Sequence, residues 1–203
     1  PPPEFSSRRR DTRSCLKSRG LGDVYKRQVR IRRGLGLQAD LAMSLNNASA
    51  FYSELAGLEG ARQGQAERLR QAVEAIEEAV SLYRGLGLRA DLAMSLGTIT
   101  LTYRAVAEST EDEQQQAIWL GKAVESIEEA LVYFRESGVV QYWALAVRQC
   151  VISHWMLAQR TGELDVERVL ALCHEGEALC GPMQDKEGLA FYRQVRQALQ
   201  GQD

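Results

Sequence analysis

Apolar residues recur every three or four positions along most of the chain after residue 37, with polar residues between them. This spacing places the apolar side chains on one face of an α-helix, so it predicts amphipathic helices rather than strands. We therefore expect an all-α protein with about seven helices. They should cover residues 38–56, 66–84, 90–107, 111–136, 141–159, 163–179 and 185–199.

Glycines and capping residues suggest where these helices end. Gly85 and Gly138 follow periodic segments and should stop them, because glycine readily takes the left-handed conformation of a helix C-terminus. Gly181-Pro182 should stop the sixth helix. Thr110, followed by Glu113 three residues later, fits a capping box and predicts Thr110 as the cap of the fourth helix.

The sequence repeats itself at an offset of 51 residues. Residues 33–45 and 84–96 are identical at twelve of thirteen positions, and residues 72–80 return as 123–131 with two changes. A fixed period of this size indicates a repeat array, in which each unit buries its apolar face against its neighbours. Each unit is predicted to be a hairpin, made of a first and a second helix.

This period sets the predicted domain organisation. The array covers residues 29–182, and a C-terminal capping helix and tail follow at 183–203. Val29–Arg33 falls on the end of a second helix in the repeat register and is interpreted as the stub of a truncated helix. The three units are expected at about 38–84, 89–136 and 141–180.

Residues 1–28 have no apolar periodicity and no initiating methionine, and they resemble a non-native sequencing or assembly artefact. We expect this segment to be disordered or non-native. Residues 1–33 hold 11 basic and 3 acidic residues, a net charge of +8, whereas the remaining 14 basic and 24 acidic residues give −10. A genuine basic arm that binds nucleic acid or acidic lipid is therefore an open alternative.

The repeated residues resemble the tetratricopeptide repeat (TPR), in which large and small residues alternate at fixed positions of two helices. The residues that match are Leu45, Ala48, Tyr52, Ala72, Ile76 and Ala79, then Leu96, Ile99, Tyr103, Ala123, Ile127 and Ala130, with a weaker third set from Val147 to Pro182. The chain is most similar to bacterial arrays that contain the sequence of Ala39–Asn47. It departs from the family in its 51-residue period and in Ser49, Thr100 and Val151, which replace a glycine.

The resemblance implies a right-handed α-solenoid of stacked antiparallel hairpins, whose first helices line a concave groove that binds a peptide or partner protein. The implied groove residues lie on the first helices, outside their apolar stripes. They are Asn46, Asn47, Ala50 and Ser53 in the first unit, Gly97, Leu101 and Arg104 in the second, and Arg148, Ile152, Trp155 and Met156 in the third.

The leading functional hypothesis is a protein–protein interaction scaffold that forms part of a larger signalling or regulatory protein. The alternative is a ligand- or peptide-sensing domain that controls an attached effector, with Tyr142, Trp143 and Trp155 lining its pocket. A deep, closed apolar cavity would favour this alternative. Exposed Val29 and Ile31 would also allow self-association through the truncated first unit.

Composition favours a cytoplasmic protein, since no run approaches the roughly 20 apolar residues of a membrane span and no signal peptide is visible. The net charge of −2 conceals the asymmetry described above, and because the basic arm is interpreted as non-native we expect neither a nucleic-acid nor a membrane partner. Cys15, Cys150, Cys173 and Cys180 are expected to be reduced thiols, because their spacing does not suit a disulfide framework.

No catalytic or cofactor-binding constellation is apparent, so we expect a non-enzymatic protein without cofactor or metal. The Gly-Leu-Gly segments lack the context of a phosphate-binding loop. His154 and His174 are the two histidines, and Cys173-His174 with Cys180 makes a weak zinc candidate because adjacent helical residues point about 100° apart. The pairs Glu77-Glu78 and Glu128-Glu129 are expected on solvated faces.

Overall fold

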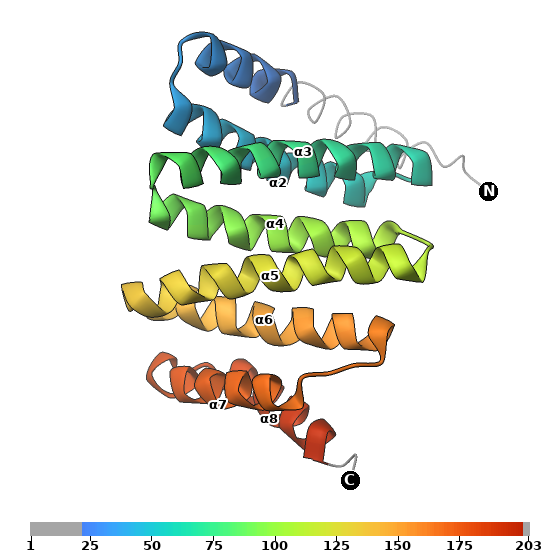
Figure 1. Ribbon diagram of the computed structural model, residues 1–203, viewed down its shortest axis with the longest axis vertical. Helices are drawn as coiled ribbons and strands as arrows, with labels where there is room; N and C mark the ends of the chain where they lie inside the picture. The colour runs from blue at the N-terminus through green and yellow to red at the C-terminus, as the bar shows by residue number, and fades with distance from the viewer. Residues whose placement is uncertain (1–21, 201–203) are drawn as a thin grey trace, which may run out of the picture. The chain divides into compact units, whose positions relative to one another are not determined.

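The computed structural model describes residues 22–200, and every regular element within this range is an α-helix (Figure 1). This confirms the predicted all-α class, and all seven predicted helices are present. An additional helix covers residues 22–34. The seven helices are α2 (Gln38–Leu58), α3 (Arg62–Leu86), α4 (Arg89–Ser109), α5 (Glu113–Ser137), α6 (Val140–Thr161), α7 (Val166–Met183) and α8 (Lys186–Gln200).

The chain forms two compact units. In unit 1 (Pro1–Gly87), α2 and α3 pack as an antiparallel hairpin. In unit 2 (Leu88–Asp203), each of the helices α4–α8 packs against the next one along the chain, which is a solenoid-like arrangement. The core of each unit comes from the predicted apolar stripes, for example Leu45, Ile76, Ile127 and Val147.

One member of the predicted stripes is misplaced. The apolar periodicity of residues 111–136 predicts Ile118 among the inward-facing residues of α5, but its side chain is 51% exposed. The reason is helical geometry, since Ile118 lies nine residues, or two and a half turns, before the buried Ile127. The two side chains therefore point to opposite sides of α5.

The helix ends correct two of the glycine predictions. Gly85 lies inside α3, and the helix ends at Gly87, which has a φ of 69° and donates its N–H to the carbonyls of Tyr83 and Arg84. Gly138 does end α5, with a φ of 66°. In α7, Pro182 lies inside the last turn, and the helix ends at Gln184 with a φ of 54°. The proline removes one backbone donor, and the N–H groups of Gln184 and Asp185 close this turn instead.

The predicted capping box is also wrong. Asp112 caps α5, because its carboxylate accepts a hydrogen bond from the backbone N–H of Gln114 at 2.9 Å. The Thr110 hydroxyl is used elsewhere, since it donates to the carbonyl of Val106 at 2.7 Å in the last turn of α4. Thr110 therefore belongs to the end of one helix rather than to the start of the next.

The N-terminal segment differs from the expectation over residues 22–28, which are helical. The Tyr25 ring lies 5.5 Å from the Phe51 ring, and both pack against the buried cluster of Ala48, Tyr52 and Ala72. In the 51-residue register Tyr25 falls on the buried Ile76, which explains why an aromatic residue is accommodated there. Residues 1–21 lie outside the described part, and a non-native origin of the segment stays a prediction.

Within residues 22–200, no helix has the length and apolarity needed to cross a membrane. Cys150, Cys173 and Cys180 are buried free thiols, and Cys15 lies outside the described residues. Cys173 is buried whereas the adjacent His174 is exposed, so these two side chains do not converge on one site. No group of three or more potential metal ligands occurs in the part of the chain that the structure describes.

Candidate protein-binding surface

Large apolar side chains are exposed on the first helices of unit 2. Met94 and Leu101 of α4 are seven residues apart, which is two helical turns, so they lie on the same side of the helix. On α6, Leu145 and Ile152 occupy the same two repeat positions, 51 residues later. Leu101 is 52% exposed and Leu145 54% exposed, whereas Ile152 is partly buried.

The exposure recurs in unit 1. Met43 of α2 falls at the repeat position of Met94 and Leu145, and the three side chains are 44%, 46% and 54% exposed. This position lies opposite the core stripe of each first helix. Met43, for example, is two residues, or about 200° of helical rotation, from each of the buried residues Leu41 and Leu45. Packing within each hairpin therefore does not account for a large apolar residue there.

A polar contact joins α4 to α6. The Nη1 of Arg104 donates to the side-chain oxygen of Gln149 at 2.6 Å, so the exposed sides of the two helices are neighbours. We call the residues Met94, Leu101, Arg104, Leu145, Gln149, Ile152 and Met156 the α4–α6 surface. Burial lowers the pKa of Arg104, an effect that the charge of Glu108 partly offsets. The Nε of Arg104 is buried without a hydrogen-bond partner among the described residues.

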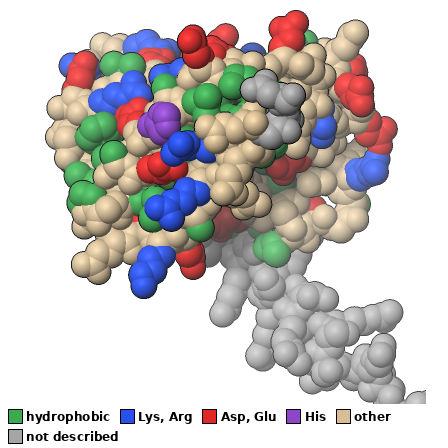
Figure 2. Space-filling model, turned by 90° about the horizontal axis from the view of Figure 1, so that it is seen from below, with side chains coloured by type: hydrophobic (Ala, Val, Ile, Leu, Met, Phe, Trp, Pro, Cys, Tyr) green, Lys and Arg blue, Asp and Glu red, His purple; other side chains and the backbone are tan. Residues whose placement is uncertain are grey.

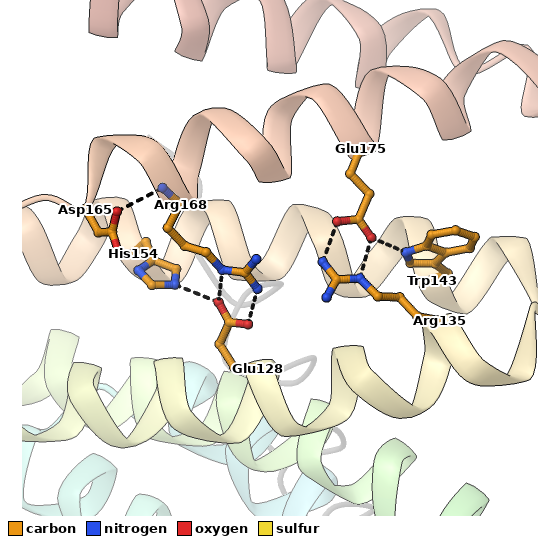
Figure 3. Close-up of polar contacts among 7 residues, drawn as sticks. All are labelled: Glu128, Arg135, Trp143, His154, Asp165, Arg168 and Glu175. Atoms are coloured by element: carbon orange, nitrogen blue, oxygen red, sulfur yellow. Dashed lines mark hydrogen bonds and ion pairs between the residues drawn. The ribbon is translucent and has the colours of Figure 1, made fainter.

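Contacts from α6 to two carboxylates, on the opposite side of the helix, fix its orientation (Figure 3). His154 Nε2 lies 3.0 Å from a carboxylate oxygen of Glu128 on α5, and the indole N–H of Trp143 donates to Glu175 on α7. His154 lies nine residues after Leu145, so the two side chains point in opposite directions. These contacts hold one side of α6 inward and leave Leu145 and Ile152 on the other side.

The same two carboxylates bind arginines between α5 and α7. Arg168 donates through Nε to Glu128 at 2.9 Å, and Arg135 donates through Nε to Glu175 at 2.7 Å, with a second contact in each pair. The partners are separated by seven residues on both helices and in the same direction. Therefore α5 and α7 run parallel to each other on this side of α6.

This network corrects the expectation that Glu128 lies on a solvated face. Burial alone would raise the pKa of Glu128, but hydrogen bonds from His154 and Arg168 outweigh it and lower the pKa to about 2. The carboxylate is therefore charged at neutral pH. Burial also raises the pKa of the nearby Cys150 thiol, with a smaller contribution from Glu128, so this thiol stays protonated and is a poor nucleophile.

The predicted groove residues fall into two groups. Seven lie on α4 and α6 of unit 2, where Leu101 is exposed and Gly97, Arg104, Arg148, Ile152, Trp155 and Met156 are partly buried. The other four lie on α2 of unit 1, where Asn47 and Ala50 are exposed and Asn46 and Ser53 are partly buried. Within the unit 2 group, the hydrogen bond from Arg104 to Gln149 joins α4 to α6. The assignment of all eleven to a binding groove stays a prediction.

Arg148 has a structural engagement that the sequence did not indicate. It binds a carboxylate oxygen of Asp185 at 2.8 Å, and its guanidinium lies 5.9 Å from the centre of the Phe191 ring. Both contacts join α6 to the α8 region. Arg148 is therefore less available to a partner than Arg104, whose recorded hydrogen bond goes to a neutral amide.

Sequence reasoning missed Met94 and Leu145, which are among the most exposed apolar residues of the surface. A signal was present, because large apolar residues recur at one repeat position that lies outside the core stripe. The Glu128 and Glu175 ion pairs were missed as well. Their signal is the matching seven-residue spacing of Glu128 with Arg135 and of Arg168 with Glu175.

The aromatic residues suggested for a ligand pocket do not share one environment. Tyr142 is exposed and stacks on Phe134 with ring centres 5.7 Å apart, whereas Trp143 hydrogen-bonds to Glu175. Unit 1 contains a cavity of about 460 Å³ and unit 2 one of about 220 Å³. None of the eleven predicted groove residues lines either of them.

The face of the molecule where α7 and α8 lie shows no patch of one charge that would indicate a second binding surface. Figure 2 shows this face from below, and the acidic and basic side chains visible there are interspersed. The hydrophobic side chains in this view form small separate areas. This face therefore offers no single charged or apolar patch as a second candidate surface.

Comparison with known proteins adds no assignment. No protein-family model matches the chain. A search of curated proteins finds none that is similar to it.

Proposed function

We propose that this chain is a protein-interaction module that binds a partner protein or peptide through the α4–α6 surface. The observation that carries the proposal is the exposed large apolar residue at one repeat position of each first helix: Met43, Met94 and Leu145. The resemblance to tetratricopeptide arrays supports the same role. In this role the chain would act as a scaffold within a larger signalling or regulatory protein.

The energetics are those of apolar side chains removed from water. Covering a half-exposed leucine or methionine contributes about 1 kcal/mol at roughly 25 cal/mol per Å². Leu101, Met94 and Leu145 together therefore offer a partner about 3 kcal/mol before the costs of association. Arg104 and Gln149 add polar groups that would orient the bound segment.

The test is a peptide array probed with the full chain, followed by affinity measurements for the peptides that bind. Leu101→Glu should weaken binding at least tenfold, because it places a charge in the middle of the apolar surface. Ile118→Glu is the matched control, since Ile118 is as exposed as Leu101 but lies on α5, outside the surface. Equal binding by both variants, or no peptide bound by the full chain, would contradict the proposal.

A further inference from the structure

Unit 1 contains a cavity of about 460 Å³ between the 22–34 helix, α2 and α3. Its apolar lining comes from all three helices: Tyr25, Val29, Leu45, Ala48, Tyr52 and Ala75. A concave, mostly apolar site of this volume lies in the range that binds small molecules. The cavity belongs to unit 1, so it is distinct from the α4–α6 surface.

Three cationic side chains of the 22–34 helix also line the cavity. Lys26, Arg30 and Arg33 are spaced by four and three residues, which places them on one face of the helix. Arg33 is engaged, since its Nη2 lies 2.6 and 2.7 Å from the two carboxylate oxygens of Glu78. Lys26 and Arg30 are exposed and make no ion pair with any residue in the 22–200 range. The site thus has an apolar floor and two available positive charges at its edge.

The repeat register relates the 22–34 helix, which forms one wall of the cavity, to α3. The 22–34 helix takes the register of α3, so Tyr25, Val29 and Arg32 fall on its buried residues Ile76, Val80 and Tyr83. Arg32 does not fill the core as Tyr83 does. It donates instead to the backbone carbonyl of Asp40 and to the hydroxyl of Ser44. The 22–34 helix therefore has an arginine at the repeat position where α3 has the buried Tyr83.

We propose that this cavity binds a small amphiphilic anion, with its apolar part on the floor and its anionic head between Lys26 and Arg30. The apolar floor favours a ligand with an apolar part over one that is charged throughout, because a charge placed on unpaired apolar surface loses its hydration. The two cations select an anion over a neutral molecule of the same shape. Their aliphatic stems cover the edge of the site while their charges reach the solvent.

Decanoate is the probe, and isothermal titration of the full chain below the micelle concentration is the measurement. We expect one site per chain and at least tenfold weaker binding of decanamide, which has the same apolar tail without the charge. Binding should also weaken as salt is raised, because the cations are exposed. Decanamide binding as tightly as decanoate, or no decanoate binding, would overturn the proposal.

Variants locate the binding in the cavity. Lys26→Glu with Arg30→Glu should reduce decanoate affinity at least tenfold, whereas Arg27→Glu, an exposed change on the same helix outside the lining, should not. Ala75→Leu fills the floor and should block binding, with circular dichroism to check the fold. Unchanged binding in the charge-reversed variant would overturn the proposal even if Ala75→Leu failed to fold. Leu101→Glu should leave decanoate binding unchanged, which separates this site from the protein-binding surface.

Discussion

The same repeat position carries an arginine in both units, but its surroundings differ. In unit 1, Arg33 binds Glu78 of α3, and the two side chains are 56% and 40% exposed. In unit 2, Arg135 lies 102 residues later, two repeat periods on, and binds Glu175 of α7. These side chains are only 34% and 18% exposed. Arg135 and Glu175 are thus less exposed to solvent than Arg33 and Glu78, so their ion pair is screened less by water and salt.

The second difference is the number of pairs. In unit 2, Glu128 and Arg168 form a further ion pair seven residues away from the first one. Glu128 and Arg168 lie seven residues before Arg135 and Glu175, and the residues seven before Arg33 and Glu78 in unit 1 are Lys26 and Gln71, which cannot form an ion pair. Among the described residues, the 22–34 helix and α3 are thus joined by the Arg33–Glu78 pair, whereas α5 and α7 are joined by two such pairs. The two units therefore share the same helical arrangement but differ in the ion pairs that stabilise it.

The largest effect is expected from Glu128→Ala. This change leaves Arg168 and His154 facing each other without their shared carboxylate, and we expect a loss of about 2–3 kcal/mol in the free energy of unfolding. Chemical denaturation followed by circular dichroism measures it. Glu125→Ala, an exposed change on the same helix, should cost less than about 0.5 kcal/mol. Similar losses for both would show that the network contributes nothing specific.

The comparison of the two arginines can be tested directly with Glu175→Ala and Glu78→Ala. Glu175 accepts from Arg135 and Trp143 in a partly buried site, so its loss should cost about 1–2 kcal/mol. Glu78 lies in an exposed pair, and its loss should cost about 0.5 kcal/mol. Denaturation of both variants at two salt concentrations provides the measurement. A larger loss for Glu78→Ala would reverse the comparison.

Acid should reveal the same network. The folded pKa of Glu128, about 2, lies below its ordinary value of 4.5, so its contribution is complete above pH 4.5 and is lost as pH falls toward 2. The stability difference between the wild type and Glu128→Gln should therefore shrink across this window, by an amount on the order of 1 kcal/mol. Urea denaturation at pH 7, 4.5 and 3 measures it. A constant difference would mean that Glu128 titrates normally.

The smallest effect is a gain. Lys26→Glu together with Gln71→Arg would place in unit 1 the second pair that unit 2 has, and we expect about 0.5 kcal/mol of added stability. Each single change serves as a control in a double-mutant cycle. A coupling energy of zero would show that the 22–34 helix and α3 are too far apart at this point.

The periodicity predicted the helices well because burial in this chain follows the 3.6-residue spacing, as in Leu45, Ile76 and Ile127. It predicted the helix ends less well. Thr110 and Pro182 have strong local preferences, yet their roles were set by which backbone groups needed partners at the junction. Ile118 shows a further limit, since an apolar residue within a periodic segment can lie on the side of the helix opposite the buried stripe.

The candidate surface was predictable only in part. Leu101, Arg104 and Ile152 follow from the resemblance and from helix geometry, whereas Met94 and Leu145 required the exposure that the structure gives. Ion pairs such as Glu128–Arg168 join residues 40 positions apart. A pairing of this kind depends on how two helices are aligned, and the spacing within one helix does not determine that.

The opposite polarity of the two pairs between α5 and α7 also controls alignment. If α7 slid by two turns, about 10 Å, Glu175 would come to lie beside Glu128, or Arg168 beside Arg135. Both displaced arrangements bring like charges together, while the observed one satisfies all four side chains. The charges therefore destabilise a shifted alignment of α7 and also stabilise the native one. This matters in a repeat protein, because its similar helices offer α7 several similar surfaces to pack against.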